Sequence, residues 1–137
     1  MDVKTDFLNG VVEEEVYVEQ PLHFETHDRE SHVYILKKAL YDLKQAPRTW
    51  YSRIDGFLSI LDFTKSKANS NLYYKVEDDN QLILLLYVDD PFVTGMNGLI
   101  ADTKRKLDAQ FEMKELGIMH YFLGMEVWQT TYGIFLG

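Results

Sequence analysis

The chain has 137 residues, of which 46% are hydrophobic and 14% aromatic, values that exclude a largely disordered protein and allow one folded domain. No apolar run approaches the roughly 18 residues of a membrane-spanning helix. No signal-peptide pattern follows Met1, so we expect an intracellular protein, cytoplasmic or nuclear, that is not secreted and has no membrane partner. The absence of cysteine excludes disulfides and thiolate metal sites.

The net charge of −8 is distributed unevenly along the chain. Residues 1–30 carry −7, residues 31–75 carry +5 and residues 76–137 carry −6. Because phosphate binding rests on Lys and Arg, the overall balance disfavours a free-standing nucleic-acid binder. A basic middle between acidic flanks is compatible with a phosphate-facing surface beside a cation-binding one, and ordinary surface charge is the simpler alternative.

The first 40 residues predict short strands joined by irregular segments. Residues 1–3 have the pattern of a strand end, and Asn9-Gly10 that of a turn. Residues 15–19 alternate polar and apolar side chains, which predicts a half-buried strand. Residues 21–31 are polar and predict a loop, whereas residues 32–40 predict a further strand.

Two helices are predicted from apolar spacings of three and four. Pro47 suits the first turn of a helix, because proline is tolerated at that position. The apolar face of this first helix consists of Trp50, Ile54, Phe57, Leu58 and Leu61. The second helix has an equivalent face, formed by Leu99, Ile100, Thr103, Leu107 and Phe111. We interpret Trp50 as a core or rim aromatic residue.

The strands between and after these helices complete the predicted fold. Residues 71–76 and 82–88 form a hairpin around an acidic turn at 77–80. Residues 82–88 are apolar without alternation, which predicts burial on both faces in the sheet centre. A short strand follows at 92–94. Residues 120–127 and 131–136 predict a last hairpin around Tyr132-Gly133. The class is therefore α+β, with two main helices packed on one face of an antiparallel sheet.

The apolar strand at 82–88 ends at two adjacent acids, Asp89 and Asp90. Burying carboxylates is costly, so the pair belongs at the strand's tip, facing solvent or a cleft. Two close carboxylates repel each other, and a hard divalent ion such as Mg²⁺ relieves the repulsion. An ordinary acidic turn between two strands is the structural alternative.

Four segments carry a resemblance to a known family. Residues 87–90 (YVDD) resemble the catalytic hairpin motif of reverse transcriptases. Residues 2–10 (DVKTDFLNG) resemble the first catalytic motif of copia-type long-terminal-repeat retrotransposon polymerases, and residues 40–50 (LYDLKQAPRTW) their second. Residues 120–127 (HYFLGMEV) resemble their primer-gripping hairpin. The motifs follow the family's order and span essentially the whole chain.

This resemblance implies one truncated palm domain over residues 1–137, built on a ferredoxin-like sheet, without fingers, thumb or RNase H. Asp2 and Asp89 would be the principal ligands of two Mg²⁺ ions, with Asp90 auxiliary and Mn²⁺ an alternative metal. The implied partners are an RNA or DNA template-primer, deoxynucleoside triphosphates and the missing segments of a Pol polyprotein. The flank left exposed by truncation is a candidate for self-association.

The resemblance also assigns residues to nucleotide and primer. Phe7 would block a ribose 2′-hydroxyl, with an ordinary core Phe as the alternative. Gln45 would contact the incoming nucleotide, and Arg48 would hold template or nucleotide phosphate. The primer backbone would be touched by the segment Phe122, Leu123 and Gly124.

Three residues depart from the family's pattern. Asp6 adds a carboxylate where the family usually has Ala, and Asp42 replaces a typical Gly. Pro91 lacks an amide hydrogen, so we expect a lost ladder hydrogen bond and a shifted carboxylate geometry.

We therefore expect an RNA-directed DNA polymerase palm with little or no activity as this chain alone. The alternative is a non-catalytic, transposon-derived remnant or interaction protein that keeps the fold. A different palm-type nucleotidyl transferase or cyclase is a third hypothesis, which the second and fourth motifs disfavour.

Overall fold

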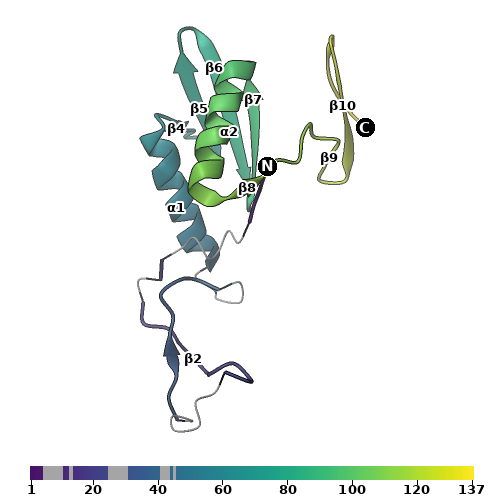
Figure 1. The fold of residues 1–137 in the computed structure, drawn as a ribbon. Coiled ribbons are helices and arrows are strands. Elements are labelled where there is room, and N and C mark those ends of the chain that lie inside the picture. Colours follow the sequence, from purple (N-terminus) through teal and green to yellow (C-terminus); the bar gives the residue numbers. More distant parts are fainter. Residues whose placement is uncertain (5–10, 13, 25–30, 41–43, 45) are drawn as a thin grey trace.

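A computed structural model describes the chain except for residues 5–10, 13, 25–30, 41–43 and 45. Its main body is a four-stranded antiparallel sheet in the order β4-β5-β6-β7 (Figure 1). These strands span Thr64–Lys65, Leu72–Glu77, Asn80–Tyr87 and Asp90–Gly95. The helices are α1 (Ala46–Ile60) and α2 (Asn97–Phe111). Neither helix is long and apolar enough to cross a membrane.

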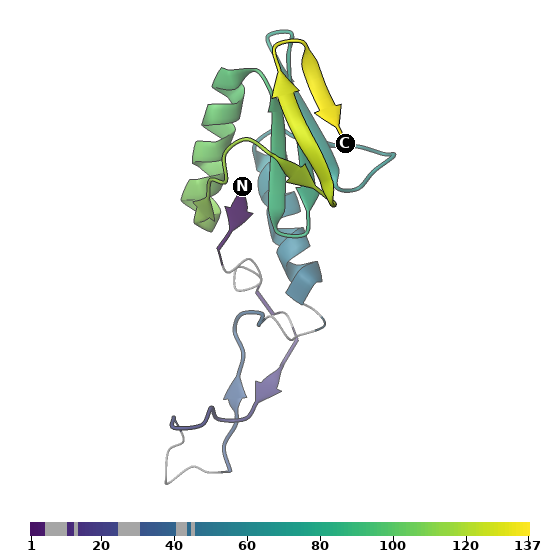
Figure 2. The ribbon, with the colours of Figure 1, turned by 90° about the vertical axis from the view of Figure 1, so that its right-hand side faces the viewer.

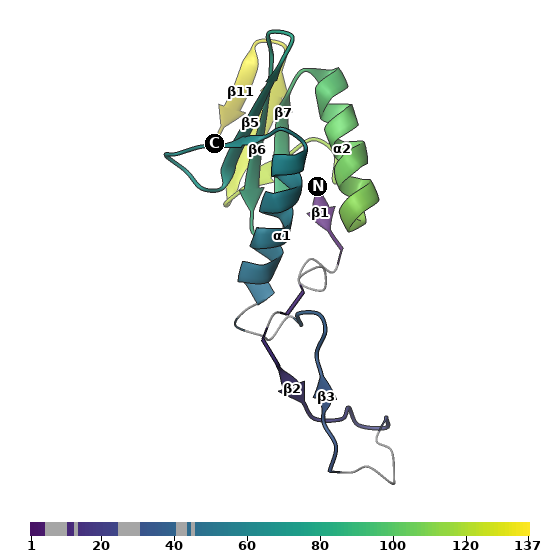
Figure 3. The same ribbon diagram turned by 90° about the vertical axis from the view of Figure 1, so that its left-hand side faces the viewer.

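The other described strands form three small antiparallel groups. β1 (Asp2–Val3) pairs with β8 (Met113–Lys114), directly after α2. β2 (Tyr17–Val18) and β3 (Tyr34–Ile35) form an arm that extends away from the main body (Figures 1 and 3). β9, β10 and β11 pair in the order β11-β10-β9, and their bounds are Tyr121–Phe122, Met125–Thr130 and Gly133–Leu136.

Both helices cover the same face of the four-stranded sheet, whereas β9–β11 lie on its other side (Figures 2 and 3). The reason lies in β6, where Leu82, Leu84 and Leu86 are buried. Side chains alternate between the faces of a strand, so these three leucines point together toward the helices. The predicted α+β class, with two helices on one face of an antiparallel sheet, is confirmed.

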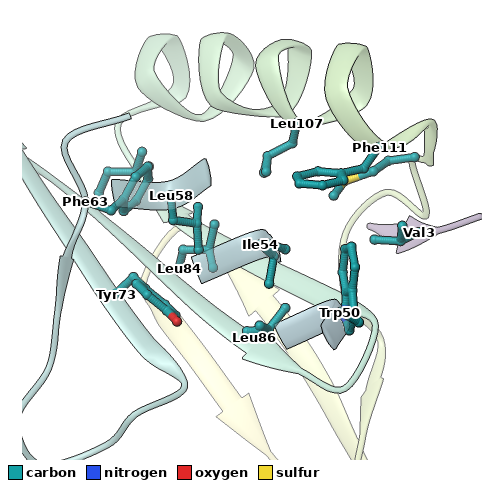
Figure 4. Packing of buried hydrophobic residues seen from close by; sticks show 12 residues of the cluster. Val3, Trp50, Ile54, Leu58, Phe63, Tyr73, Leu84, Leu86, Leu107 and Phe111 are labelled. Atoms are coloured by element: carbon teal, nitrogen blue, oxygen red, sulfur yellow. The ribbon is translucent and has the colours of Figure 1, made fainter. Parts of the chain in front are cut away.

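The core lies between this leucine face and the predicted apolar faces of the helices (Figure 4). Phe111 of α2 joins the two helices, because its ring meets those of Trp50 and Phe57 edge-on at 5.3 and 5.2 Å. The buried cluster consists of Val3, Trp50, Ile54, Leu58, Phe63, Tyr73, Leu82, Leu84, Leu86, Leu107, Phe111 and Met113. Val3 brings β1 into this core, which fixes the strand that carries Asp2.

A polar cluster holds the middle of α1 to the first strands of the sheet. Asp55 Oδ1 accepts hydrogen bonds from Lys65 Nζ at 2.6 Å and from the Tyr73 hydroxyl at 2.7 Å. Burial acts to raise the Asp55 pKa, but the hydrogen bonds from Lys65 and Tyr73 bring that pKa below its ordinary value. The Tyr51 hydroxyl donates to the Ser70 carbonyl beside this cluster. These bonds limit how far α1 can move along the sheet.

The prediction that residues 82–88 are buried on both faces is wrong. Ile83 is 37% exposed and Tyr87 is 45% exposed, because α1 and α2 both cover the opposite face of β6 (Figures 2 and 3). A smaller cover comes from β9, where Phe122 meets Tyr87 and Phe92 edge-on at 5.9 and 5.3 Å. β6 therefore has one packed face and one partly covered face.

Several predicted strands are shorter than expected. Within residues 15–19 and 32–40, the strands cover only Tyr17–Val18 and Tyr34–Ile35, and the strand predicted at 131–136 covers Gly133–Leu136. Residues 120–127 contain two strands, β9 and the start of β10, because the chain reverses at Leu123 and Gly124. Both residues have positive φ, 50° and 81°, the pattern of a type I′ turn. The predicted hairpin between β10 and β11 is confirmed.

The single packed face of β6 predicts unequal effects of two neighbouring substitutions. Leu84→Ala removes a fully buried side chain and is expected to lower the free energy of unfolding by about 3 kcal/mol. Ile83→Ala, on the partly exposed face of the same strand, is expected to lower it by about 1 kcal/mol or less. Urea unfolding followed by circular dichroism measures both. Equal losses would contradict the one-sided packing.

Candidate active site

The acidic pair lies at the tight turn between β6 and β7. Tyr87 and Asp90 face each other across the hairpin, so Val88 and Asp89 form a two-residue turn. Val88 has φ 55° and Asp89 does not have positive φ, the pattern of a type II′ turn. Glycine normally occupies the first position of that turn, and a β-branched residue there costs on the order of 1–3 kcal/mol. Backbone strain of this kind persists only where neighbouring contacts maintain it.

One such contact comes from α1. The indole Nε1–H of Trp50 donates a hydrogen bond to the Val88 carbonyl oxygen at 3.0 Å. Trp50 is 2% exposed, so its interpretation as a core aromatic residue is confirmed. The sequence did not predict this hydrogen bond, since no spacing rule relates a side chain to a backbone carbonyl 38 residues away.

Asp2 lies on a neighbouring strand. β1 contacts β7, and the amino group of Met1 donates to the Pro91 carbonyl oxygen at 3.2 Å. The following residue, Asp2, is half-buried and pairs with Lys114 in the β1–β8 ladder. The structure thus brings β1, where the motif at residues 2–10 begins, into contact with β7, where the motif at residues 87–90 ends. Asp2 is close enough for its charge to act on Asp90.

Burial of the Asp90 carboxyl raises its pKa, and the Asp89 charge raises it further. The Met1 ammonium opposes this effect, and the Asp2 charge adds a smaller contribution in the raising direction. Asp90 Oδ1 is buried and has no hydrogen-bond partner in the described part of the chain. Buried carboxylate oxygens normally have partners, so this atom has an unmet need for a donor or a cation.

The donor set suits a hard cation in part. Carboxylate oxygens are the ligands that Mg²⁺ prefers, and the unpaired Asp90 oxygen offers one. Over the described residues, however, no group of three or more His, Cys, Asp or Glu side chains is placed to hold a metal ion. The site therefore fits a divalent cation in charge and donor type, without a closed cage of three side chains.

Most of the residues assigned to nucleotide binding lie in parts of the chain that the structure does not describe. Phe7 and Gln45 lie outside the described residues, as do Asp6 and Asp42. Arg48 is exposed in the first turn of α1, the same turn that leads to Trp50.

The residues assigned to the primer grip lie beside the acidic hairpin. Phe122 packs against Tyr87, which precedes the turn, and against Phe92, which lies two residues after Asp90. Leu123 is 62% exposed, and Gly124 completes the exposed turn. The structure therefore brings this segment next to the hairpin that carries Asp89 and Asp90.

The expectation that Pro91 removes a ladder hydrogen bond is wrong for the β6–β7 pair. Tyr87 and Asp90 flank a two-residue turn and form a hydrogen-bonded pair, so the next pair, Leu86 and Pro91, is not hydrogen-bonded. Accordingly, the Leu86 amide points the other way and donates to the Asn71 carbonyl at 2.8 Å. β7 is also the edge of its sheet, where proline is tolerated.

The α+β fold carries an acidic hairpin between β6 and β7, and comparison with known proteins gives the family of the chain. The family described as "Reverse transcriptase (RNA-dependent DNA polymerase)" matches residues 1–137. The chain belongs to this family, and its resemblance to copia-type retrotransposon proteins is confirmed. No solved structure gives a significant match to the chain.

Three relatives illustrate the similarity. The chain is 45% identical over 129 residues to the Retrovirus-related Pol polyprotein from transposon TNT 1-94 of Nicotiana tabacum, covering 93% of this chain and 10% of the relative. It is 36% identical over 137 residues to that from transposon RE1 of Arabidopsis thaliana, covering 99% and 9%. It is 34% identical over 134 residues to the Putative transposon Ty5-1 protein YCL074W of Saccharomyces cerevisiae, covering 97% and 44%. The chain thus spans about a tenth of the first two and under half of the third.

The raised Asp90 pKa predicts how this carboxylate affects stability without a cation. An acid whose folded pKa is raised above 3.8 contributes stability at low pH that is lost as pH rises through the folded pKa. Asp90→Asn is therefore expected to raise the melting temperature at pH 7 in buffer containing chelator, and to reduce the loss of stability on going from acid to neutral pH.

Differential scanning fluorimetry across pH measures both effects. Asp78→Asn serves as the control, because Asp78 is exposed at the turn between β5 and β6. A lower melting temperature for Asp90→Asn at pH 7 would contradict the assignment of a buried, repelled carboxylate.

Proposed function

We propose that this chain is the catalytic palm region of an RNA-directed DNA polymerase, acting on a template-primer and deoxynucleoside triphosphates. The observation that supports the proposal is the contact of β1, the strand of Asp2, with β7, the strand that begins at Asp90. Membership of the reverse transcriptase family supports the proposal, since a polymerase of this class needs several carboxylates in one site to hold its metal ions.

In this proposal Asp2 and Asp89 are the principal ligands of two Mg²⁺ ions, and Asp90 is an auxiliary ligand. When bound, such ions lower the barrier to in-line attack on a nucleotide phosphorus by activating the hydroxyl and stabilising the leaving group. The chain itself supplies position and negative charge. The unpaired Asp90 oxygen supports this assignment, because its burial makes a cation the partner that would relieve it.

We assign the remaining contacts from the resemblance to the family's motifs. Arg48, exposed at the start of α1, would hold a phosphate of template or nucleotide. Gln45 would contact the incoming nucleotide, and Phe7 would exclude a ribose 2′-hydroxyl. The Phe122–Gly124 turn would contact the primer backbone, which is supported by the packing of Phe122 against the acidic hairpin.

We also propose that efficient polymerisation needs further polyprotein segments. The relatives from Nicotiana tabacum and Arabidopsis thaliana are about ten times longer than the matched region, and the net charge of −8 leaves this chain poor in phosphate contacts. The outer face of β6 and the strands β9–β11 expose apolar side chains that such segments, or a second copy, would cover.

One observation favours a second candidate, a non-catalytic interaction protein that retains the fold. The described carboxylates do not form a group of three placed around a metal ion. A protein of this kind would keep the core and the hairpin without binding a divalent cation with useful affinity. Cation binding therefore separates the two candidates.

Divalent cations are expected to stabilise the protein. At a Mg²⁺ or Mn²⁺ concentration of ten times the dissociation constant, binding to the folded state adds about 1.4 kcal/mol and raises the melting temperature by a few degrees. Asp89→Asn is expected to abolish the rise, because it removes a proposed ligand. Thermal melts with and without the ion measure both.

The turn between β5 and β6 offers a matched control, since it also carries two adjacent aspartates, Asp78 and Asp79. Both have positive φ, a conformation that asparagine tolerates, so the double change to Asn preserves the turn. This variant is expected to keep the full cation effect. No shift in the parent protein, or an equal loss in the control, favours the non-catalytic candidate.

Primer extension on an RNA template tests the polymerase directly. The bare chain is expected to extend poorly, whereas the same chain joined to the flanking polyprotein segments of a relative is expected to extend the primer. Asp89→Asn in the joined protein is the negative control. Clear extension by the bare chain would show that the additional segments are not needed, and failure of the joined protein would argue against catalysis.

A further inference from the structure

The turn that carries Asp89 has an unfavourable backbone at one residue. Val88 adopts φ 55° at the first position of a two-residue turn, where its branched side chain is disfavoured. Asp89 follows directly, so the orientation of the Val88–Asp89 peptide decides the direction in which the Asp89 side chain leaves the backbone. A relaxed Val88 with negative φ would rotate this peptide and move the carboxylate.

The acceptor in the Trp50 hydrogen bond belongs to that same peptide. Trp50 Nε1–H donates to the carbonyl oxygen of Val88 at 3.0 Å, and this carbonyl is the one bonded to the Asp89 nitrogen. The indole has one N–H donor and no acceptor, so rotating the peptide away would leave a buried donor without its partner. The contact therefore opposes relaxation of the turn.

The position of the indole is fixed independently of the turn. Its ring packs edge-on against Phe111 at 5.3 Å and lies beside Val3 in the core (Figure 4). α1, which carries Trp50, is anchored a turn later by Asp55, whose carboxylate binds Lys65 of β4 and Tyr73 of β5. The donor thus belongs to a rigid frame, and the flexible partner is the turn.

We propose that Trp50 is a positioning residue, whose indole N–H holds the Val88–Asp89 peptide and thereby aims the Asp89 carboxylate. The role in metal binding rests on the proposed function, whereas the conformational role does not. Trp50 touches neither substrate nor metal, and acts through the backbone of the turn. This role differs from that of an ordinary core aromatic residue, for which a phenyl ring of similar burial would suffice.

The test compares two aromatic residues of α1. Trp50→Phe keeps an aromatic ring in the core and removes the donor, whereas Phe57→Leu disturbs packing against the same Phe111 ring and leaves the hydrogen bond intact. Mn²⁺ binding is measured by electron paramagnetic resonance of the free ion. Trp50→Phe is expected to weaken Mn²⁺ affinity about tenfold, and Phe57→Leu to change it by less than about twofold.

A rescue separates positioning from packing. Val88→Gly is expected to restore most of the lost affinity in the Trp50→Phe background, because glycine adopts positive φ without strain and suits the first position of a type II′ turn. Val88→Gly alone is expected to leave the affinity nearly unchanged. Unchanged affinity in Trp50→Phe, or no recovery in the double variant, overturns the inference.

A readout without metal distinguishes failure of this inference from failure of the proposed function. In ¹H–¹⁵N spectra of the metal-free protein, Trp50→Phe is expected to shift the Asp89 and Asp90 amides far more than Phe57→Leu does. If the parent protein binds no Mn²⁺ but these shifts occur, the metal assignment fails and the positioning role stands. If the two variants shift those amides equally, the positioning role is wrong.

Discussion

Burial of alternate leucines on one face of β6 is the constraint on which the rest of the structure depends. Leu82, Leu84 and Leu86 face the helices, and their side chains form the floor of the core. Because the period of a strand is two residues, a shift by one position would expose all three and turn Ile83 and Leu85 toward the helices, together with the polar groups of Gln81 and Tyr87. The packed face therefore fixes the register of β6, and with it the point at which the chain turns at Val88 and Asp89.

The helices convert this register into a defined position for the acidic turn. α1 is held at one point by the bonds of Asp55 to β4 and β5, and at another by the packing of Trp50 on Phe111. α2 leads directly into β8, which pairs with β1 and so carries Asp2 to the side of β7. Elements far apart in the sequence thus converge on one end of the sheet. No single one of them would define the site alone.

The helices were predictable because their apolar residues recur at the helical period. Trp50, Ile54, Leu58, Leu107 and Phe111 are buried, whereas Phe57, Leu61, Leu99 and Ile100 are partly buried against the core. The prediction for residues 82–88 failed because an apolar strand has the same sequence pattern whether two layers cover it or one. The outer side is covered in part by β9, where Phe122 packs against Tyr87. Opposite pairs in a hairpin alternate between hydrogen-bonded and non-hydrogen-bonded, counting from the turn. The type of pair at Pro91 is therefore known only once the pairing of Tyr87 with Asp90 is known. The reversal at Leu123 interrupts a continuous apolar pattern through φ values that the sequence indicates only by Gly124.

The candidate site divides in the same way. Family resemblance indicated which acids to follow, and the topology brings β1, the strand of Asp2, into contact with β7, the strand that begins at Asp90. The Trp50–Val88 bond had no signal in the sequence, because it joins an α-helix to a hairpin through a backbone atom. Contacts to backbone atoms carry no preference for the identity of the accepting residue, so they are visible only in three dimensions.

Backbone strain and charge repulsion coincide at the turn that carries Asp89. A β-branched residue at positive φ costs on the order of 1–3 kcal/mol, a large share of the roughly 5–15 kcal/mol that stabilises a typical domain. The neighbouring carboxylates add a further unfavourable contribution, which burial increases at Asp90. Such an arrangement can persist only because other contacts stabilise the turn. These contacts are the packing of the β6 leucines in the core and the hydrogen bond from Trp50 to Val88. A bound cation would reverse the sign of the carboxylate contribution while leaving the backbone strain unchanged, so the protein needs a rigid support for the turn whether or not the cation is present.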